Sequence, residues 1–199
     1  PKGGIWLSII LHPKFDISIT TLFPIASSLA LSYAIEKITK TSPSLKWPND
    51  LTVNGKKLAG MLVDVSMQSN RIESLVLGVG INFNVNVKEI GKELKNTSNY
   101  YGIASLTEQK DKVTAIELVQ SFLLELEKIY ELLNTGQTKK IISEWTKRSS
   151  TIGKIVELNI INGKIKGKAI RIDNDGALVV SENKKNHRVI AGDIIHLSK

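Results

Sequence analysis

Hydrophobic and polar positions alternate along two neighbouring stretches in the first half of the chain. The first runs from residue 58 to residue 68 and the second from 72 to 83, with apolar side chains at most odd-numbered positions. Such alternation is typical of β-strands that bury one face. A short polar segment around Asn70 separates the two stretches, so we expect them to pair as antiparallel strands.

The expected register gathers three glycines on one face of this pair. With a turn centred on Asn70, Gly60 lies opposite Gly80 and Leu62 lies opposite Gly78. The residues that then share the bare face are Gly60, Gly78, Gly80, Asp64 and Asn82. Glycine inside a strand loses packing, so this face predicts a flat ligand or another backbone against the sheet. A bulge or a closely packed helix is the alternative.

Two turns precede the long strands. Residues 47–50 (WPND) predict a tight polar turn, because proline fixes φ and the short Asn and Asp side chains bond to local backbone. Asn54-Gly55 is a strong signal for a type I′ hairpin turn between residues 51–53 and the strand that follows Lys57.

The first helix is expected at residues 22–38, where apolar side chains occupy almost every face. Thr20 or Thr21 is the expected N-cap, and Pro24 falls in the first turn, where a missing N–H costs nothing. A helix this apolar should be largely buried and support the sheet.

A second, amphipathic helix is expected after Thr114, which has capping-box spacing to Glu117. Asn134-Thr135-Gly136 should stop it, and a shorter helix should run through Trp145. Residues 85–112 are polar and predict a loop with at most a short helix. Residues 5–11 have the length and β-branching of a buried strand.

From Gly153 onward the pattern changes to short strands separated by turn residues, namely Asn162-Gly163, Asp175-Gly176 and Ala191-Gly192-Asp193. This spacing predicts a small five-stranded β-barrel. The fold class expected is therefore α/β, with a mixed, largely antiparallel sheet and helices at residues 1–150 and a small barrel at 151–199.

Composition narrows the function classes. The 199 residues are 42% hydrophobic, contain no cysteine, and carry a net charge of +8. Nine basic and five acidic residues fall in 152–199, so half of that charge lies in the C-terminal part and half in the rest. The positive charge suits acidic partners, but no basic block interleaved with aromatic residues predicts a nucleic-acid platform.

The absence of cysteine gives no support to an oxidising compartment. We find no apolar run of membrane-spanning length and no signal-peptide pattern, so a soluble cytoplasmic protein is expected. The three histidines are far apart and lack the spacing of zinc ligands. The sequence has no P-loop, and residues 78–83 (GVGINF) lack the third glycine of a dinucleotide fingerprint.

Three motifs in the central stretch resemble those of the biotin–protein ligase family. They are residues 46–50 (KWPND), 57–62 (KLAGML) and 78–84 (GVGINFN), in this order and at these spacings. The resemblance implies a catalytic domain with a class II synthetase-like sheet and an SH3-like C-terminal barrel. Residues 1–8 (PKGGIWLS) resemble the segment just after the family's glycine- and arginine-rich loop, which closes over biotin and the adenylate. By this resemblance the loop itself and the strands before it are not in the sequence.

The resemblance also implies the reaction and its residues. The family uses ATP to make biotinyl-5′-AMP and then transfers biotin to a lysine of biotin carboxyl carrier protein, part of acetyl- or propionyl-CoA carboxylase. Lys57 aligns with the catalytic lysine, whereas Lys56 is expected in solvent. The residues implied to bind nucleotide or biotin are Trp47, Asn49, Asp50, Gly60, Gly78, Gly80 and Asn82, with Asp50 also near Mg²⁺. Packing alone is the alternative explanation for Trp47.

Other readings remain open. A lipoate–protein ligase-like acyltransferase would share the fold and the lysine, and a non-catalytic binding or regulatory module is the other alternative. The barrel could be a stabilising cap, or it could help to close the nucleotide site or receive the carrier. An exposed strand edge favours a homodimer, as the family often forms. No DNA-binding domain and no membrane association are expected.

Overall fold

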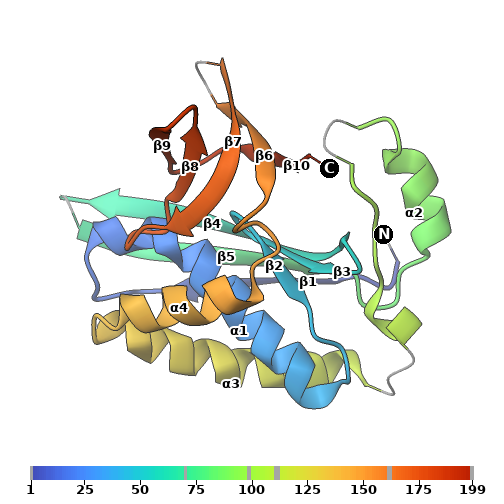
Figure 1. Ribbon diagram of the computed structural model, residues 1–199. Helices are drawn as coiled ribbons and strands as arrows, with labels where there is room; N and C mark the ends of the chain where they lie inside the picture. The colour runs from blue at the N-terminus through green and yellow to red at the C-terminus, as the bar shows by residue number, and fades with distance from the viewer. Residues whose placement is uncertain (1, 70, 98–99, 110–112, 161–162, 198–199) are drawn as a thin grey trace.

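The computed structural model describes residues 2–69, 71–97, 100–109, 113–160 and 163–197, and within them two antiparallel sheets (Figure 1). The first sheet has the strand order β1-β5-β4-β3-β2. Its strands are β1 (Ile5–Leu11), β2 (Ser44–Lys46), β3 (Asp50–Val53), β4 (Lys56–Gln68) and β5 (Arg71–Ile81). The expected mixed α/β class with a largely antiparallel sheet is confirmed.

The expected register of the two long strands is also confirmed. Gly60 pairs with Gly80 and Leu62 pairs with Gly78 across β4 and β5. The odd-numbered side chains Met61 and Val79 are buried on the opposite face. The turn centre Asn70 lies outside the described residues, as does Asn162 of the predicted Asn162-Gly163 turn.

The short turns before β4 also form as predicted. Residues 47–49 connect β2 to β3, with Lys46 opposite Asp50. Asn54 and Gly55 both have positive φ, 51° and 74°, which is the backbone that a type I′ turn requires.

The first helix begins differently from the prediction. A 3₁₀ turn, η1 (Ile17–Leu22), comes first and is capped by the Asp16 side chain, which accepts from the Ser18 N–H. The α-helix α1 (Phe23–Ile38) follows directly, with Leu22 at its N-cap position and no side-chain cap. The prediction that Thr20 or Thr21 caps this helix was therefore wrong, because the 3₁₀ turn already occupies the amide groups that such a cap would serve.

The run Ile17–Ile38 also corrects the expectation about membrane-spanning length. Its 22 residues are long and apolar enough to cross a membrane by length and composition alone. In the fold this run supplies the core: Leu22, Phe23, Leu29 and Ile35 are fully buried. A core helix that is covered on most sides has the same composition as a membrane span.

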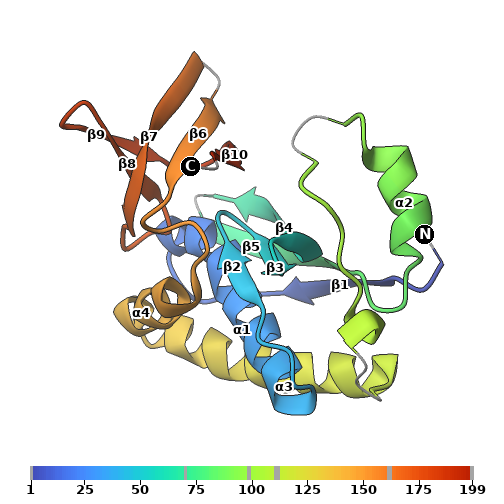
Figure 2. The ribbon, with the colours of Figure 1, turned by 45° about the vertical axis from the view of Figure 1, so that its right-hand side comes forward.

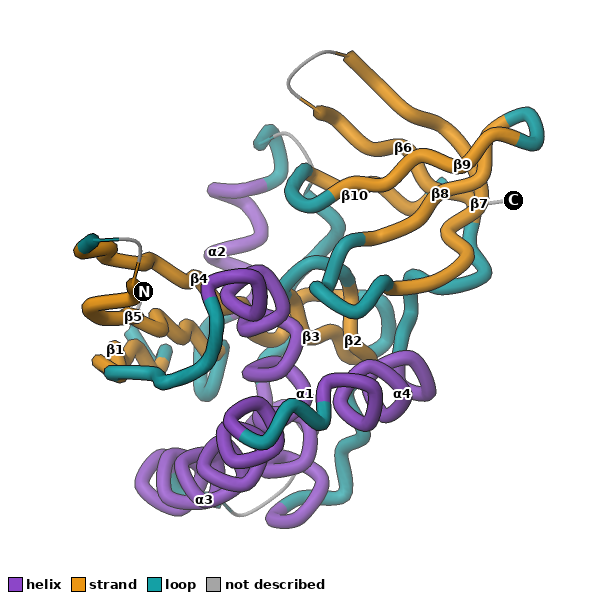
Figure 3. Tube along the Cα trace, turned by 90° about the vertical axis from the view of Figure 1, so that its left-hand side faces the viewer, coloured by secondary structure: helices purple, strands orange, loops and turns teal. Residues whose placement is uncertain are grey.

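Helices cover one face of the first sheet. α1 packs on β4, and α3 (Ala115–Asn134) and α4 (Thr138–Arg148) pack against α1. Figure 3 shows these three helices on one side of the sheet. The predicted capping box of α3 is present, since Thr114 and Glu117 bond reciprocally, and Gly136 with φ of 70° follows its end. On the other side of the sheet lie α2 (Val87–Leu94) and the second sheet.

The second sheet has the order β10-β6-β7-β8-β9. Its strands are β6 (Ile155–Ile160), β7 (Gly163–Ile172), β8 (Leu178–Glu182), β9 (Lys185–Val189) and β10 (Asp193–His196). The five strands agree with the sequence pattern, while the SH3-like closure and the division into domains at residue 150 stay predictions. Trp47 joins the two sheets, because its indole N–H donates to the Gly176 carbonyl at 3.0 Å.

Candidate functional site

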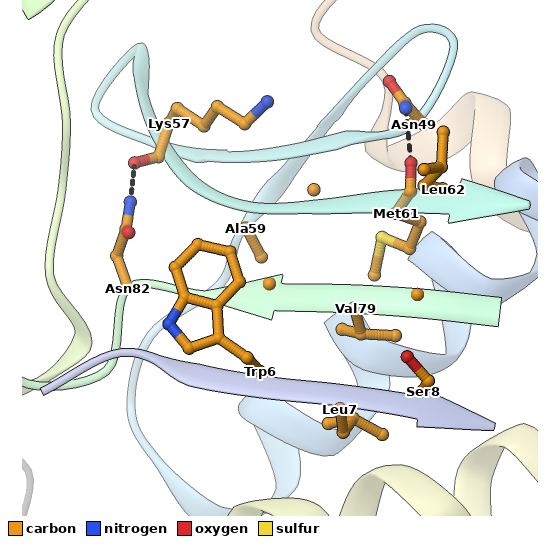
Figure 4. Close-up of a pocket in the computed structure, with 13 residues that line it drawn as sticks. Trp6, Leu7, Ser8, Asn49, Lys57, Ala59, Met61, Leu62, Val79 and Asn82 are labelled. Carbon is orange, nitrogen blue, oxygen red and sulfur yellow. Dashed lines mark hydrogen bonds between the residues drawn. The ribbon is translucent and has the colours of Figure 1, made fainter. Parts of the chain in front are cut away.

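A cavity of about 650 Å³ opens on the face of the first sheet that α1, α3 and α4 leave uncovered. Figure 4 shows its wall, which is built from β1, β4 and β5. The lining residues are Trp6, Leu7, Ser8, Asn49, Lys57, Ala59, Gly60, Met61, Leu62, Gly78, Val79, Gly80 and Asn82. The three glycines predicted to share a face therefore lie in one cavity, together with Lys57, Asn49 and Asn82.

Each of the three glycines has a different neighbour on this face. A Cβ at Gly80 would lie 2.6 Å from the Trp6 ring, and one at Gly60 would lie 3.1 Å from the Lys57 amino nitrogen. At Gly78 the nearest atom would be the Leu62 carbonyl oxygen at 3.7 Å, an ordinary contact. Side chains thus lie against this face at Gly80 and Gly60, where a flat ligand or another backbone was predicted, and of the three glycines Gly78 alone would take a Cβ at ordinary contact distance.

Trp6 and Leu62 are site residues that the sequence analysis did not single out. Trp6 pairs with Gly80 across β1 and β5, and its indole projects over β5 (Figure 4). Both side chains are unusually exposed for their size, Trp6 at 65% and Leu62 at 71%. Exposed apolar groups beside bare glycines form a surface suited to a flat or aliphatic ligand.

Lys57 and Asp50 form the charged part of the site. The Lys57 Nζ lies 2.6 Å from Asp50 Oδ1, and the side chains are 44% and 14% exposed respectively. Asp50 Oδ2 accepts a hydrogen bond of 2.7 Å from the Tyr101 hydroxyl. Burial, and next the Asp50 carboxylate, raise the pKa of Tyr101, so its hydroxyl stays protonated and remains a donor.

Asn49 and Asn82 are fixed by backbone groups of the same hairpin. The Asn82 side-chain amide donates to the Lys57 carbonyl at 3.1 Å, and that of Asn49 donates to the Met61 carbonyl (Figure 4). Each asparagine therefore presents its remaining oxygen from a held position. Asp64, also expected on this face, is exposed and lies beyond the cavity lining.

A second cavity of about 500 Å³ lies on the far side of the Lys57–Asp50 pair. It shares Asn49 and Lys57 with the first cavity and adds polar groups from the segment after α2. Lys46 and Trp47 also border it, and the Trp47 side chain is 1% exposed and anchored to Gly176. The geometry thus favours packing over ligand binding for the Trp47 indole.

The side chains around the two cavities offer few donors to a metal ion. The described residues contain no group of three or more His, Cys, Asp or Glu side chains that could hold one. Among the side chains that the structure describes, Asp50 is the one carboxylate that lines either of these two cavities. One carboxylate suffices for Mg²⁺ that arrives with a nucleotide, since phosphate oxygens and water complete its shell.

The Trp47 turn is also held at the boundary between the sheets. Its backbone N–H donates to the Thr151 hydroxyl, which lies 3.2 Å from His196 Nε2. Burial, and next the positive charges of Lys46 and Lys154, lower the pKa of His196 to about 4. His196 is therefore neutral at physiological pH and belongs to the structure that supports the site.

Two family models match this sequence. Residues 1–82 match the Biotin/lipoate A/B protein ligase family, and residues 151–197 match the Biotin protein ligase C terminal domain. The first match contains all three glycines, Lys57 and Asn82. The second match begins where the chain leaves α4 for the second sheet.

Curated relatives resemble nearly the whole chain. The Bifunctional ligase/repressor BirA of Bacillus subtilis is 29% identical over 192 residues, which is 96% of this chain and 58% of the relative. The Biotin--[acetyl-CoA-carboxylase] ligase of Mycobacterium tuberculosis is 29% identical over 178 residues, 87% of this chain and 61% of the relative. The chain therefore spans about three fifths of the length of these relatives.

Solved structures agree in fold. The biotin protein ligase of Aquifex aeolicus superposes with a TM-score of 0.84 at 25% identity, covering 98% of this chain and 83% of that one. The same enzyme in complex with biotin and ATP gives a TM-score of 0.81 at 26% identity, covering 97% and 78%.

Proposed function

Because this chain belongs to the biotin protein ligase family, we propose that it supplies the catalytic sheet and C-terminal part of a biotin–protein ligase. The observation that carries the proposal is the Lys57–Asp50 pair at the rim shared by an apolar and a polar cavity. The solved relative with biotin and ATP supports these two substrates. The polypeptide would make biotinyl-5′-AMP and pass biotin to a carrier lysine.

The first step joins two anions. A carboxylate oxygen of biotin attacks the α-phosphorus of ATP, the bond to the bridging oxygen breaks, and pyrophosphate leaves. A fixed cation stabilises the charge that develops on the α-phosphate oxygens. Lys57 is the cation that lies between the cavities, so we assign it this catalytic role.

The second step transfers the acyl group. The carrier lysine, as the free amine, attacks the acyl carbon of the mixed anhydride; AMP leaves with the bridging oxygen, and the amine loses its proton. The residues proposed to hold biotin and the nucleotide are Trp6, Asn49, Gly60, Gly78, Gly80 and Asn82. We assign Trp47 a supporting role, and Asp50 orients Lys57 and contacts the Mg²⁺ that accompanies ATP.

The remaining parts of the proposal concern partners and location. The acceptor is the biotin carboxyl carrier protein of acetyl- or propionyl-CoA carboxylase, in agreement with the name of the Mycobacterium tuberculosis relative. We propose a homodimer, because β1 is an edge strand of the first sheet with exposed Trp6 and Ile10. The cytoplasmic location expected from the sequence stays part of this proposal.

Lipoate transfer is the second candidate, because the matched family model includes lipoate ligases. The match of residues 151–197 to a biotin protein ligase C-terminal domain favours biotin. The test incubates the chain, alone and joined to the N-terminal part of its Bacillus subtilis relative, with ATP, a carrier protein, and either biotin or lipoate. We expect the carrier to gain the mass of biotin; a gain with lipoate alone would favour the alternative, and no gain with either acid would favour a non-catalytic module.

A further inference from the structure

The segment 101–104, which follows α2, holds Lys57 through its backbone. The Lys57 N–H donates to the Gly102 carbonyl at 3.0 Å, and the Ala104 N–H donates to the Lys57 carbonyl at 2.9 Å. Lys57 and Ile103 form an isolated parallel bridge. Figure 2 shows the chain running back from α2 past the β3–β4 hairpin. This segment thus pairs with the hairpin at Lys57 itself, through a single bridge.

The same segment supplies Tyr101, whose side chain contacts Asp50, the ion-pair partner of Lys57. Tyr101 donates to Asp50 Oδ2 at 2.7 Å, while Asp50 Oδ1 faces the Lys57 ammonium at 2.6 Å. The Lys46 Nζ lies 3.4 Å from the centre of the Tyr101 ring, so the ring is held on its face as well. The hydroxyl therefore approaches the carboxylate from a fixed ring.

We infer that Tyr101 is a positioning residue for adenylate formation: its hydroxyl fixes the rotation of the Asp50 carboxylate, and that carboxylate in turn aims the Lys57 ammonium. This inference rests on the function proposed above. A carboxylate that is 14% exposed has little water to replace a lost donor. Without the hydroxyl, Oδ2 turns to find another partner, and Lys57 loses the fixed anion that orients it.

The expected effect falls on the chemical step. A misplacement of a reacting group by about 1 Å can cost about a hundredfold in rate. We therefore expect Tyr101→Phe to slow single-turnover formation of biotinyl-5′-AMP by roughly ten- to a hundredfold, while the dissociation constants for biotin and ATP change less than about twofold. Phenylalanine keeps the ring beside Lys46 and the backbone that holds Lys57.

The matched control is Tyr130→Phe on α3, which removes the same atom from a tyrosine that is not among the residues lining either cavity, and it should leave the rate unchanged. A second arm introduces Tyr101→Phe into an Asp50→Asn background. If the Tyr101 hydroxyl acts through the Asp50 carboxylate, it has no carboxylate to position in the Asp50→Asn protein. Adding Tyr101→Phe to that protein should then cause no further loss of rate. A residue that only stabilised the fold would lower the rate equally in both backgrounds.

The possible results separate a failure of the proposed function from a failure of the Tyr101 inference. The parent is the chain joined to the N-terminal part of its Bacillus subtilis relative, and a parent that forms no adenylate overturns the proposed function and this inference with it. An active parent with an equally active Tyr101→Phe variant overturns the inference alone. So would equal losses in the parent and Asp50→Asn backgrounds, or a Tyr101→Phe protein that is unfolded at the assay temperature, because each assigns the hydroxyl to stability.

Discussion

Replacing Lys57 by alanine is the perturbation that separates a catalytic lysine from a surface lysine. Its neighbour Lys56 provides the control, because both substitutions remove one positive charge from the same hairpin. The Lys56 side chain is exposed and its stem lies over Gly102, away from the first cavity. Lys57 lines both cavities and contacts Asp50.

The structure sets the size of each effect. The Lys57–Asp50 pair is 44% exposed on the lysine side, so solvent screens it, and its loss should lower the free energy of unfolding by about 1 kcal/mol or less. Removing one donor aimed at developing charge costs about 3 kcal/mol of transition-state stabilisation, which is roughly a hundredfold in rate. Lys56→Ala should change stability by no more than about 0.5 kcal/mol and leave the rate unchanged.

The assay measures single-turnover formation of biotinyl-5′-AMP in the chain joined to the N-terminal part of its Bacillus subtilis relative. Urea denaturation of the same proteins supplies the stability change, so a rate loss through unfolding is recognised. We expect the two variants to differ about a hundredfold in rate and by less than about 1 kcal/mol in stability. If Lys57→Ala and Lys56→Ala form the adenylate as fast as the parent, Lys57 is not the catalytic cation.

Three further predictions follow from the site and its support. Gly78→Val should weaken biotin binding by about tenfold or more, because the valine side chain would fill the cavity. It should not lower the melting temperature, since the new Cβ meets only Leu62, at ordinary contact distance. Unchanged binding by calorimetry would contradict this prediction. The pKa of His196 is lowered to about 4 in the fold and is about 6.5 in the unfolded chain. Between these two values the unfolded state binds more protons, so the folded state loses stability as the pH falls from about 6.5 to about 4. This loss should be about 1 kcal/mol after screening by solvent, and the gap in unfolding free energy between the parent and His196→Gln should shrink across that window; a constant gap would refute the assignment. Thr114→Ala should cost about 1 kcal/mol because it removes the capping box of α3, and an unchanged urea midpoint would argue against that contribution.

The parts of the site that could be predicted from the sequence depend on interactions between residues that are close together in the chain. The register of Gly60 with Gly80 follows from period-two alternation on both sides of one short turn, so an error of one residue would have turned every buried side chain outward. The hairpin turn at Asn54-Gly55 and the capping box at Thr114 are more local still, because each of these two is fixed by residues fewer than five positions apart.

The rest depends on contacts between distant segments. Tyr101 reaches Asp50 across 51 positions from a polar segment without periodicity, so nothing in the sequence pointed to the pair. Trp6 covers Gly80 because β1 pairs with β5. Residues 5–11 were predicted as a buried strand, which was wrong, because β1 lies at the edge of the sheet and leaves Trp6 and Ile10 exposed. That pairing places the Trp6 side chain against Gly80 and not against Gly78.

The most direct test of the proposed reaction follows the carboxylate oxygen of biotin. Biotin labelled with ¹⁸O in both carboxylate oxygens is incubated with ATP, a biotin carboxyl carrier domain, and the chain joined to the N-terminal part of its Bacillus subtilis relative, and AMP and pyrophosphate are weighed by mass spectrometry. If the carboxylate attacks the α-phosphorus and AMP then leaves with the bridging oxygen, AMP carries one ¹⁸O and pyrophosphate carries none. Biotinylated carrier accompanied by unlabelled AMP, or no AMP at all, would contradict the proposed mechanism.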